Sequence, residues 1–547
     1  MVALQSELLR QCREAMRPRL FPQIYLPALF LLAALLAFAS NLNSYFLSDD
    51  FVQIGKVLHG DFSVAWGQEH GGFFRPLFIL SYIVDSRVWQ GRPFGYHLTN
   101  ILIHALNSFL VFKLGLRLFQ NLKLPISSIK AAAAAAAALF LLHPSHTEAV
   151  TWISGRADLL ATLFCLASLW SYCAYLDTRR GTFLILALAF GALALLGKES
   201  AVSLAFLILI VGLYFSRGRR VLIEFGAFIV TTLAFVLVRA SFLGSIVGGY
   251  GTGQHLNFAP AWIRDRLLEA SARSILPALP ATWSWFLFKP LQSPLFILIA
   301  LASLGLFAGA VVLRRRHYES ADRKRQNRLL LVLGTLFLLA LLPVINLRLS
   351  LYETWGERFL YLPTVFSCLL IGYLSIILIG NRTIWLVLLI CALGFYGWRL
   401  YVSNQVWRQA AQLTRSIKDE LTASSSQKPL TILNAPDNLR GVPVFHNGLP
   451  EALQFFQAQM RVELVEINAF QTLQSTHDVI EVSDSDETLT VRPINRWDEF
   501  DRVSSTNCLE LIRQTPDGLT FKRKPCLTTV DVYFFSGGKM RSVFESR

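Results

Sequence analysis

The chain is 547 residues long, with 54% hydrophobic residues, only 16% charged residues and a formal net charge of +15. This composition excludes an ordinary soluble protein, in which about 25% of residues are charged. The positive charge does not indicate a nucleic-acid partner, because the basic residues cluster between apolar segments and the polar C-terminal part has a nearly balanced charge.

Apolar segments recur along residues 24–401, and a membrane span requires about 20 such residues. The first segment is long for the apolar region of a cleaved signal peptide, so we expect it to be retained as a helix. We predict eleven transmembrane helices, in chain order residues 24–42, 97–119, 129–142, 157–176, 182–197, 199–215, 221–240, 293–313, 329–346, 359–379 and 383–401. Eight consecutive alanines at 131–138 indicate close helix packing rather than chemistry.

The composition turns polar at about residue 402. Short segments with β-strand character predict a soluble α/β domain over residues 402–547; they are 431–433, 462–467, 488–491 and 530–535. The expected fold class is therefore mainly α, with a polytopic helical membrane domain over residues 1–401 followed by this domain. Cys508 and Cys526 are the only cysteines of the polar part, and they would pair in an oxidising compartment.

Lysine and arginine clusters fall in alternate connections between the predicted helices, which is typical of the cytoplasmic side of a membrane protein. With a basic N-terminus inside, every cluster lies inside and the C-terminal domain lies outside. Five polar segments then share the outer face, namely residues 48–50, 143–148, 197–200, 248–273 and 353–363. Polar groups at this depth are costly and usually line a cavity, so we predict an outward-facing active site at membrane level.

Motifs in these segments follow one another across about residues 40–370. They are Ser48-Asp-Asp50, Arg75-Pro-Leu77, Tyr96-His-Leu-Thr-Asn-Ile-Leu-Ile-His-Ala105, His143-Pro-Ser-His-Thr-Glu-Ala-Val150, Gly155-Arg-Ala-Asp-Leu-Leu160, Gly197-Lys-Glu199 and Glu357-Arg-Phe-Leu-Tyr-Leu-Pro363. In them the chain resembles C-type (GT-C) glycosyltransferases and, more closely, the transmembrane and tetratricopeptide-repeat-containing (TMTC-type) O-mannosyltransferases. The resemblance implies a polyprenyl-phosphate-linked sugar donor, an acidic residue in the first outer loop and inverting transfer.

The resemblance stops near Trp407. Beyond it we find no repeat of about 34 residues, the period of tetratricopeptide repeats. This departure leaves the protein acceptor of that family open for this chain. It suits a bacterial relative, which predicts a multi-pass protein of the inner membrane whose active site and C-terminal domain face the periplasm.

The pair Asp49-Asp50, in the first outer loop (residues 43–96), is the predicted catalytic site. Glycosyl transfer to a hydroxyl requires a base that accepts the hydroxyl proton, which a carboxylate in a suitable environment can do. We favour Asp49, the first acidic residue of such pairs in the resembling families. The alternative is N-capping of a short helix that begins near Phe51. No cofactor or metal is expected, although a divalent cation on the paired carboxylates is a minority interpretation.

The departing phosphate carries charge that cationic side chains can stabilise. Lys198 and Arg358 fall at helix ends on the outer face, and with Arg75 and Arg156 they are the predicted donor phosphate-binding residues. The alternative for each cation is an ordinary ion pair or a side chain that reaches to the membrane surface.

Five further polar residues are expected to line the site: His143, His146, Glu148, Glu199 and Glu357. Neutral histidines could bind the donor or relay protons. Zinc binding by the two histidines is disfavoured because Pro144 interrupts the helix that would align them. The glutamates could instead pair with the cations, Glu199 or Glu148 with Lys198 and Glu357 with Arg358.

These features predict an inverting glycosyltransferase that moves a sugar, mannose by the resemblance, from a polyprenyl phosphate to an acceptor hydroxyl of a protein serine or threonine. The runner-up acceptor is a cell-envelope glycan or lipid. Different classes are a transporter of a lipid-linked substrate, which would place polar residues at mid-membrane, and a non-catalytic scaffold. The expected partners are the lipid-linked sugar, the acceptor and the bilayer, with no nucleic acid.

Overall fold

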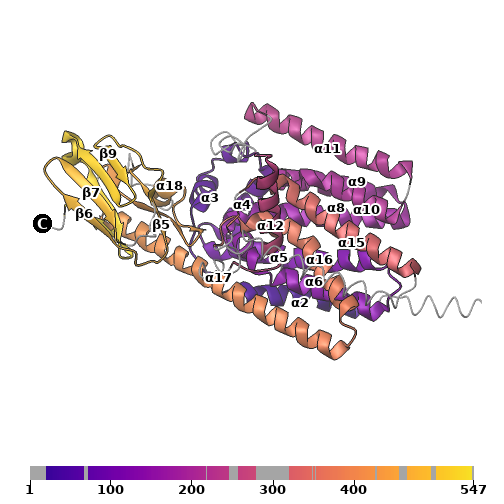
Figure 1. Ribbon diagram of the computed structural model, residues 1–547. Coiled ribbons are helices and arrows are strands. Elements are labelled where there is room, and N and C mark those ends of the chain that lie inside the picture. Colours follow the sequence, from indigo (N-terminus) through magenta and orange to yellow (C-terminus); the bar gives the residue numbers. More distant parts are fainter. Residues whose placement is uncertain are drawn as a thin grey trace, which may run out of the picture.

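The computed structural model describes residues 20–66, 72–216, 218–245, 257–278, 320–347, 349–350, 353–424, 428–454, 465–494 and 500–544. Helices form a bundle at one end of the molecule and strands form a domain at the other, with one long helix joining the two (Figure 1). The expected fold class, a mainly helical membrane protein with a C-terminal α/β domain, is confirmed.

Every predicted span that falls in the described part coincides with a helix. These helices are α2 (Leu20–Phe38), α5 (Pro93–Phe119), α6 (Ile126–Leu141), α8 (Arg156–Thr178), α9 (Gly181–Gly197), α10 (Leu204–Phe215), α11 (Arg219–Leu243), α15 (Ser320–Leu341), α16 (Tyr361–Leu378) and α17 (Arg382–Ser424). The predicted span 293–313 lies outside the described residues.

By length and composition, the described part holds six helices able to cross a membrane, or seven if the bent pair of α6 and residues 144–150 is one span. Three further apolar helices are shorter. Large apolar side chains on the outer face of α11 stand exposed, among them Ile223 at 69% and Leu237 at 70%. Such a surface is stable only against lipid or another apolar partner, in keeping with a multi-pass membrane protein.

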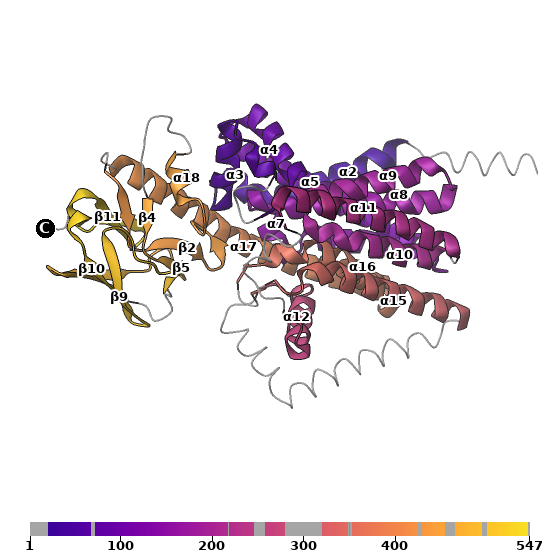
Figure 2. The same cartoon turned by 90° about the horizontal axis from the view of Figure 1, so that it is seen from above.

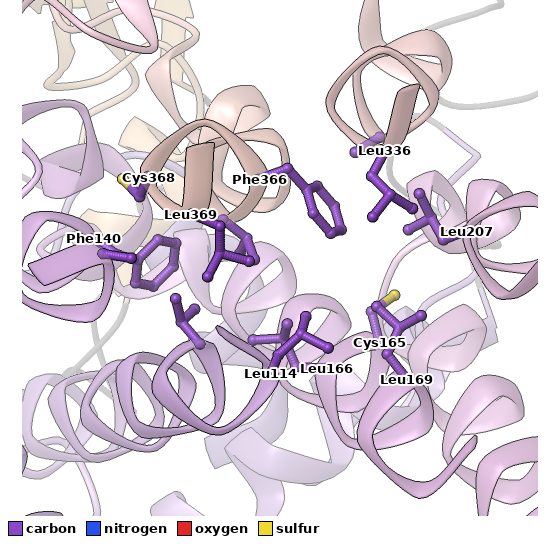
Figure 3. Packing of buried hydrophobic residues seen from close by; sticks show 14 of the residues in the cluster. Leu114, Phe140, Cys165, Leu166, Leu169, Leu207, Leu336, Phe366, Cys368 and Leu369 are labelled. Carbon is purple, nitrogen blue, oxygen red and sulfur yellow. The ribbon is translucent and has the colours of Figure 1, made fainter. Parts of the chain in front are cut away.

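The bundle core is formed where α5, α6, α8, α10, α15 and α16 meet. Figure 3 shows side chains of these helices, including Leu114, Phe140 and Phe366, packed in this core. The alanine run of α6 lies against α5 and α16, as expected from its small side chains. A methyl group added at Gly372 of α16 would lie 2.6 Å from the backbone oxygen of Ala132, so glycine is required for this approach.

Short elements cap the end of the bundle that faces the strand domain. Between α2 and α5 lie α3 (Asp49–Leu58), η2 (Ser63–Trp66) and α4 (Pro76–Trp89), which Figures 1 and 2 both place at this end. Other short elements are η1 (Ala39–Asn41), η3 (Pro144–His146), α7 (Thr147–Val150), η4 (Ile153–Gly155), η5 (Glu199–Ser203), α12 (Pro260–Arg273), η8 (Leu342–Val344) and η9 (Glu357–Leu360).

Helix α17 runs without a break for 43 residues from the bundle to the strand domain (Figure 1). The predicted domain boundary between residues 401 and 402 therefore falls inside a helix. An α-helix satisfies its own backbone hydrogen bonds in lipid and in water alike. The change in composition consequently marks where the helix leaves the apolar region, whereas the strand domain begins at β1 (Leu430–Ile432).

The described part of the C-terminal domain contains three small sheets, with strand orders β12-β11-β1-β4, β6-β7-β10-β9 and β3-β2-β5-β8. The remaining elements are β2 (Ala435–Leu439), β3 (Val442–Pro443), α18 (Leu449–Gln454), β4 (Val465–Ile467), β5 (Phe470–Leu473), β6 (Ile480–Asp484), β7 (Thr488–Pro493), β8 (Phe500–Asp501), β9 (Leu509–Thr515), β10 (Gly518–Arg523), η10 (Pro525–Thr529), β11 (Asp531–Ser536) and β12 (Lys539–Ser542). Strand β1 pairs in parallel with β11 and β4. The four predicted strands correspond to β1, β4, β7 and β11, and Cys508 and Cys526 form a disulfide.

A second apolar core joins the C-terminal domain to the first outer loop and α17. Phe51 of α3 stacks on Phe445, which follows β3, with ring centroids 6.2 Å apart. Trp407 of α17 is fully buried in the same core. Because aromatic burial of this kind is strongly favourable, the domain packs against the loop that carries Asp49-Asp50.

Candidate active site

A cavity of about 340 Å³ lies between the capped end of the bundle and the C-terminal domain. Its walls come from six places in the chain: the start of α3, the segment before α4, the start of α8, the turn between α9 and η5, η9 and its preceding loop, and the loop after β3. The lining includes one acidic residue of the predicted pair and three of the four predicted cations: Asp49, Arg75, Lys198 and Arg358.

The two adjacent aspartates have different environments. Asp49 is half-buried and lines the cavity, and its Oδ1 accepts a hydrogen bond of 2.8 Å from Asn447 Nδ2. Asp50 is 1% exposed, and its carboxyl accepts hydrogen bonds from the backbone of Leu47 and from both the backbone N–H and the hydroxyl of Ser154. Asp50 therefore ties α3 to the segment before α8, and Asp49 is the member of the pair that substrate can reach.

Local backbone geometry explains this divergence. Both aspartates lie in the first turn of α3, where negative charge is favourable near the helix N-terminus. The residue before them, Ser48, has a φ of 47°, which is uncommon for a non-glycine residue. Helix α3 thus begins at the pair itself rather than near Phe51.

Within the described residues, no three or more His, Cys, Asp or Glu side chains converge as a metal site.

Lys198 is held in a buried ion pair on the cavity wall. Its Nζ lies 2.7 Å and 2.6 Å from the two carboxylate oxygens of Asp158, in the first turn of α8. The Lys198 side chain is 2% exposed, and both residues line the cavity. The alternative interpretation of Lys198 as an ordinary ion pair named Glu199 or Glu148 as its partner, and this is wrong because Glu199 faces Arg75 and Glu148 faces Arg358. The alternative pairing of Arg358 with Glu357 is wrong for the same reason, since Glu357 pairs with Arg273.

Arg75 and Arg358 also carry carboxylate partners. Arg75 forms a bidentate ion pair with Glu199, in which its Nε lies 2.9 Å from Oε2 and its Nη2 lies 2.5 Å from Oε1. The guanidinium of Arg358 pairs with Glu148, whose other oxygen accepts the Arg358 backbone N–H at 2.9 Å. Planar guanidinium groups held in this way present ordered donors to an anion. The cavity is therefore lined by three cations whose positions are fixed by carboxylates.

Arg156 does not belong to this wall, although the sequence suggested it as a phosphate ligand. Its side chain is completely buried and pairs with Asp85 at 2.7 Å. It also donates to the side chain of Asn100 at 2.7 Å and to the backbone oxygen of Tyr96 at 2.9 Å. The Arg156 guanidinium is saturated by partners inside the protein and links α4, α5 and α8.

The two predicted histidines and Glu357 lie in the protein behind the cavity. His143 contacts the backbone oxygen of Ser274 at 3.1 Å, and His146 contacts the hydroxyl of Thr364 at 2.8 Å. Both histidines are fully buried. Glu357 pairs with the buried Arg273 of α12. These three residues position η3, α12 and η9 relative to one another.

Sequence reasoning missed several cavity residues. Asp158 falls within the Gly155–Leu160 motif, and a carboxylate inside a predicted membrane helix is itself a signal. His446 and Asn447 line the cavity from the C-terminal domain, where no motif marked them. Trp152 and Trp355 supply aromatic surface to the wall, and Trp355 packs edge-on to His446 with ring centroids 5.1 Å apart.

No family model matches the chain. Over 188 residues it is 32% identical to protein O-mannosyl-transferase Tmtc1 of Drosophila melanogaster. This alignment covers 31% of this chain and 20% of the relative. Over 396 residues it is 26% identical to protein O-mannosyl-transferase TMTC1 of Homo sapiens, covering 63% of this chain and 43% of the relative. The predicted resemblance to the TMTC-type O-mannosyltransferases is confirmed, and the chain spans less than half of the length of these curated relatives.

Among solved structures, ArnT from Cupriavidus metallidurans in the apo state aligns with 90% of this chain and 97% of that chain. The sequence identity is 12% and the TM-score is 0.47.

Proposed function

We propose that the protein is an inverting membrane glycosyltransferase that moves a sugar from a polyprenyl-phosphate donor to an acceptor hydroxyl. The observation that carries this proposal is the joint presence of Asp49, Arg75, Lys198 and Arg358 on one cavity of about 340 Å³. The relatives reported above are named for O-mannosyl transfer to proteins, which supports mannose as the sugar and a protein hydroxyl as the acceptor.

In the proposed reaction, Asp49 accepts the proton of the acceptor hydroxyl while the hydroxyl oxygen forms a bond to the anomeric carbon. The bond between the anomeric carbon and the donor phosphate oxygen breaks, and polyprenyl phosphate departs with the electron pair. Arg75, Lys198 and Arg358 stabilise the charge that develops on this phosphate. Attack from the side opposite the leaving group inverts the configuration at the anomeric carbon.

A lipid-linked donor agrees with the surroundings of the cavity. A small apolar cleft lined by residues such as Leu341, Val344 and Leu360 shares Leu347 and Phe359 with the cavity. In the proposed complex the donor phosphate faces the cations, and the start of the prenyl chain lies against this apolar surface. We propose that the site opens to the periplasmic side of a bacterial inner membrane, since the positive-inside pattern places the C-terminal domain outside.

The purified protein, incubated with defined polyprenyl-phospho-sugars and an acceptor, is expected to release polyprenyl phosphate. Asp49→Asn should lower kcat about 10²–10⁴-fold, the usual contribution of a general base. Asp61→Asn is the matched control, because Asp61 lies in the same outer loop and its side chain is 45% exposed. Mass spectrometry of the acceptor identifies the product, with a serine- and threonine-containing peptide and an envelope glycan or lipid as separate arms.

Donor that binds without any phosphate release, across all sugars and acceptors, would refute an enzymatic role. If the protein is a non-catalytic scaffold, Asp49→Asn and Asp61→Asn should release the same amount of polyprenyl phosphate. A transporter predicts donor movement across proteoliposomes with the glycosidic bond intact.

A further inference from the structure

The loop that follows β3 reaches from the C-terminal domain onto the first turn of α3. We call residues 444–448 the roof loop. The backbone N–H of Ser48 donates to the backbone oxygen of Val444 at 3.0 Å, and the backbone N–H of Asn447 donates to the Ser48 hydroxyl at 3.0 Å. The loop is therefore bonded to the residue that immediately precedes Asp49.

The end of the roof loop lies unusually close to α3. Gly448 has a φ of +83°, and a methyl group built on it would lie 2.5 Å from the backbone oxygen of Ser48. Glycine alone combines this backbone conformation with so near an approach. Together with the stacking of Phe445 on Phe51, these contacts hold the loop in one position over the pair.

A buried carboxylate holds the middle of the roof loop from inside the C-terminal domain. Asp437 Oδ1 lies 2.9 Å from His446 Nδ1, and Arg502 pairs with Asp437 and donates to the backbone oxygen of His446 at 2.7 Å. Burial alone would raise the pKa of Asp437, but the hydrogen bond and charge of His446 lower it. The loop is thus anchored at its centre by a charged group.

The side chain that this arrangement presents to Asp49 is an amide. Asn447 Nδ2 donates to Asp49 Oδ1 at 2.8 Å, and both side chains line the cavity. An amide N–H can orient a carboxylate without competing for its proton, because the nitrogen of an amide donates and does not accept. With Oδ1 held in this way, Oδ2 is the oxygen left to face an acceptor.

We propose that Asn447 is a positioning residue that holds the Asp49 carboxylate in its reactive orientation, so that the C-terminal domain completes the active site of the membrane domain. This inference rests on the proposed function, since it assigns Asp49 the task of taking the acceptor proton. The soluble α/β domain that the sequence predicted then becomes part of the catalytic cavity.

The first test compares Asn447→Ala with Asn507→Ala in the full-length protein. Asn507 lies in the same domain, and its Nδ2 also donates to a carboxylate, Glu466, at 2.5 Å, away from the cavity. Misplacing a catalytic group typically costs up to about 100-fold in rate. We expect Asn447→Ala to lower kcat about 10–100-fold with a donor KM within about twofold of the unchanged protein, and Asn507→Ala to leave both constants unchanged.

The second test uses Asn447→Asp, which keeps the shape of the side chain and places a second carboxylate against Asp49. A like charge disfavours ionisation of its neighbour. The acid limb of the pH–kcat profile should move to higher pH by about one unit, with activity recovering at alkaline pH. The titratable and charged groups around Asp49 are Asp50 on its own helix, and Arg75, Asp158, Lys198, Arg358 and His446 on the cavity wall.

The outcomes separate this inference from the proposed function. If the unchanged protein binds polyprenyl phosphate but transfers no sugar, the proposed function fails before Asn447 is tested. If the unchanged protein is active and Asn447→Ala matches Asn507→Ala, with the pH profile of Asn447→Asp unmoved, the positioning role is overturned. The melting temperature of each variant shows whether the variant is folded. A variant that has lost only the positioning of Asp49 keeps its melting temperature and has a shifted pH profile, whereas a variant that has lost folding has a lower melting temperature.

Discussion

Lys198 Nζ and the Asp158 carboxylate form a buried ion pair on the cavity wall, with both carboxylate oxygens within 2.7 Å of the nitrogen. The lysine directly follows the last residue of α9 and the aspartate lies in the first turn of α8, so the pair joins two helices at the point where they meet the cavity. The lysine charge is therefore compensated before a donor arrives. In the proposed reaction, a donor phosphate at this wall shares the ammonium group with Asp158.

This pair predicts opposite outcomes for single and double variants. Lys198→Met should destabilise the protein by about 3–5 kcal/mol, because it leaves Asp158 charged and buried without a partner. The double variant Lys198→Met/Asp158→Asn removes both charges and should regain most of this stability. It should not regain donor affinity, since the phosphate still lacks its ammonium contact. Thermal unfolding and donor KM measure the two effects, and a double variant as unstable as Lys198→Met would contradict the argument.

Arg75 and Arg156 should respond differently to substitution. Arg75→Ala removes a cation that lines the cavity and should raise the donor KM about tenfold or more, the value of one lost charge-assisted hydrogen bond. Arg156→Ala leaves the buried Asp85 unpaired and should instead lower the melting temperature. Folded Arg156→Ala protein should keep a nearly unchanged donor KM. A large KM increase with normal stability for Arg156→Ala would restore it as a phosphate ligand.

Asp50 should make stability depend on pH around neutrality. Burial raises the pKa of Asp50 from 3.8 to about 7, against the hydrogen bonds from Ser154 and Leu47, which lower it. The folded protein then keeps this proton up to about pH 7, whereas the unfolded chain loses it near pH 4. The contribution of Asp50 to stability is therefore full below about pH 4 and is lost as pH rises toward 7.

Melting temperatures of the unchanged protein and of Asp50→Asn measure this effect. The melting temperature of the unchanged protein should fall relative to that of Asp50→Asn between about pH 5 and pH 7, and the difference should then stay constant. Asp61→Asn serves as the control, since the exposed Asp61 has a lowered pKa and does not titrate in that window. Parallel curves for the unchanged protein and Asp50→Asn would show that Asp50 titrates normally.

Gly448→Ala should disturb the contact between the roof loop and α3. The added methyl group would meet the Ser48 oxygen at 2.5 Å, in addition to the backbone strain of a positive φ. Gly60→Ala is matched for strain, because Gly60 has a φ of +78° and nothing lies within 4 Å of its added methyl group. Strain alone costs about 1–3 kcal/mol. We therefore expect a lower melting temperature and kcat for Gly448→Ala than for Gly60→Ala, and equal effects would contradict a close contact.

Much of the fold follows from local sequence patterns. The ten predicted spans in the described part match helices because an apolar run must satisfy its backbone hydrogen bonds internally in lipid. Four predicted strands match because β-branched alternation is a local signal. The position of Asp49 on a cavity could also be expected, since the polar segments were placed on one face by charge distribution alone.

The partners of those polar residues were decided by tertiary structure. Residues 198 and 199 are adjacent, yet their side chains diverge to Asp158 and Arg75, and no spacing rule in the sequence encodes which way each one turns. Asn447 lies 398 residues from Asp49 along the chain and has no motif around it. Periodicity and charge report the environment of a segment, and they determined that this is a multi-pass membrane protein whose polar motifs gather on one face. Only the packing of distant segments determines which carboxylate meets which cation.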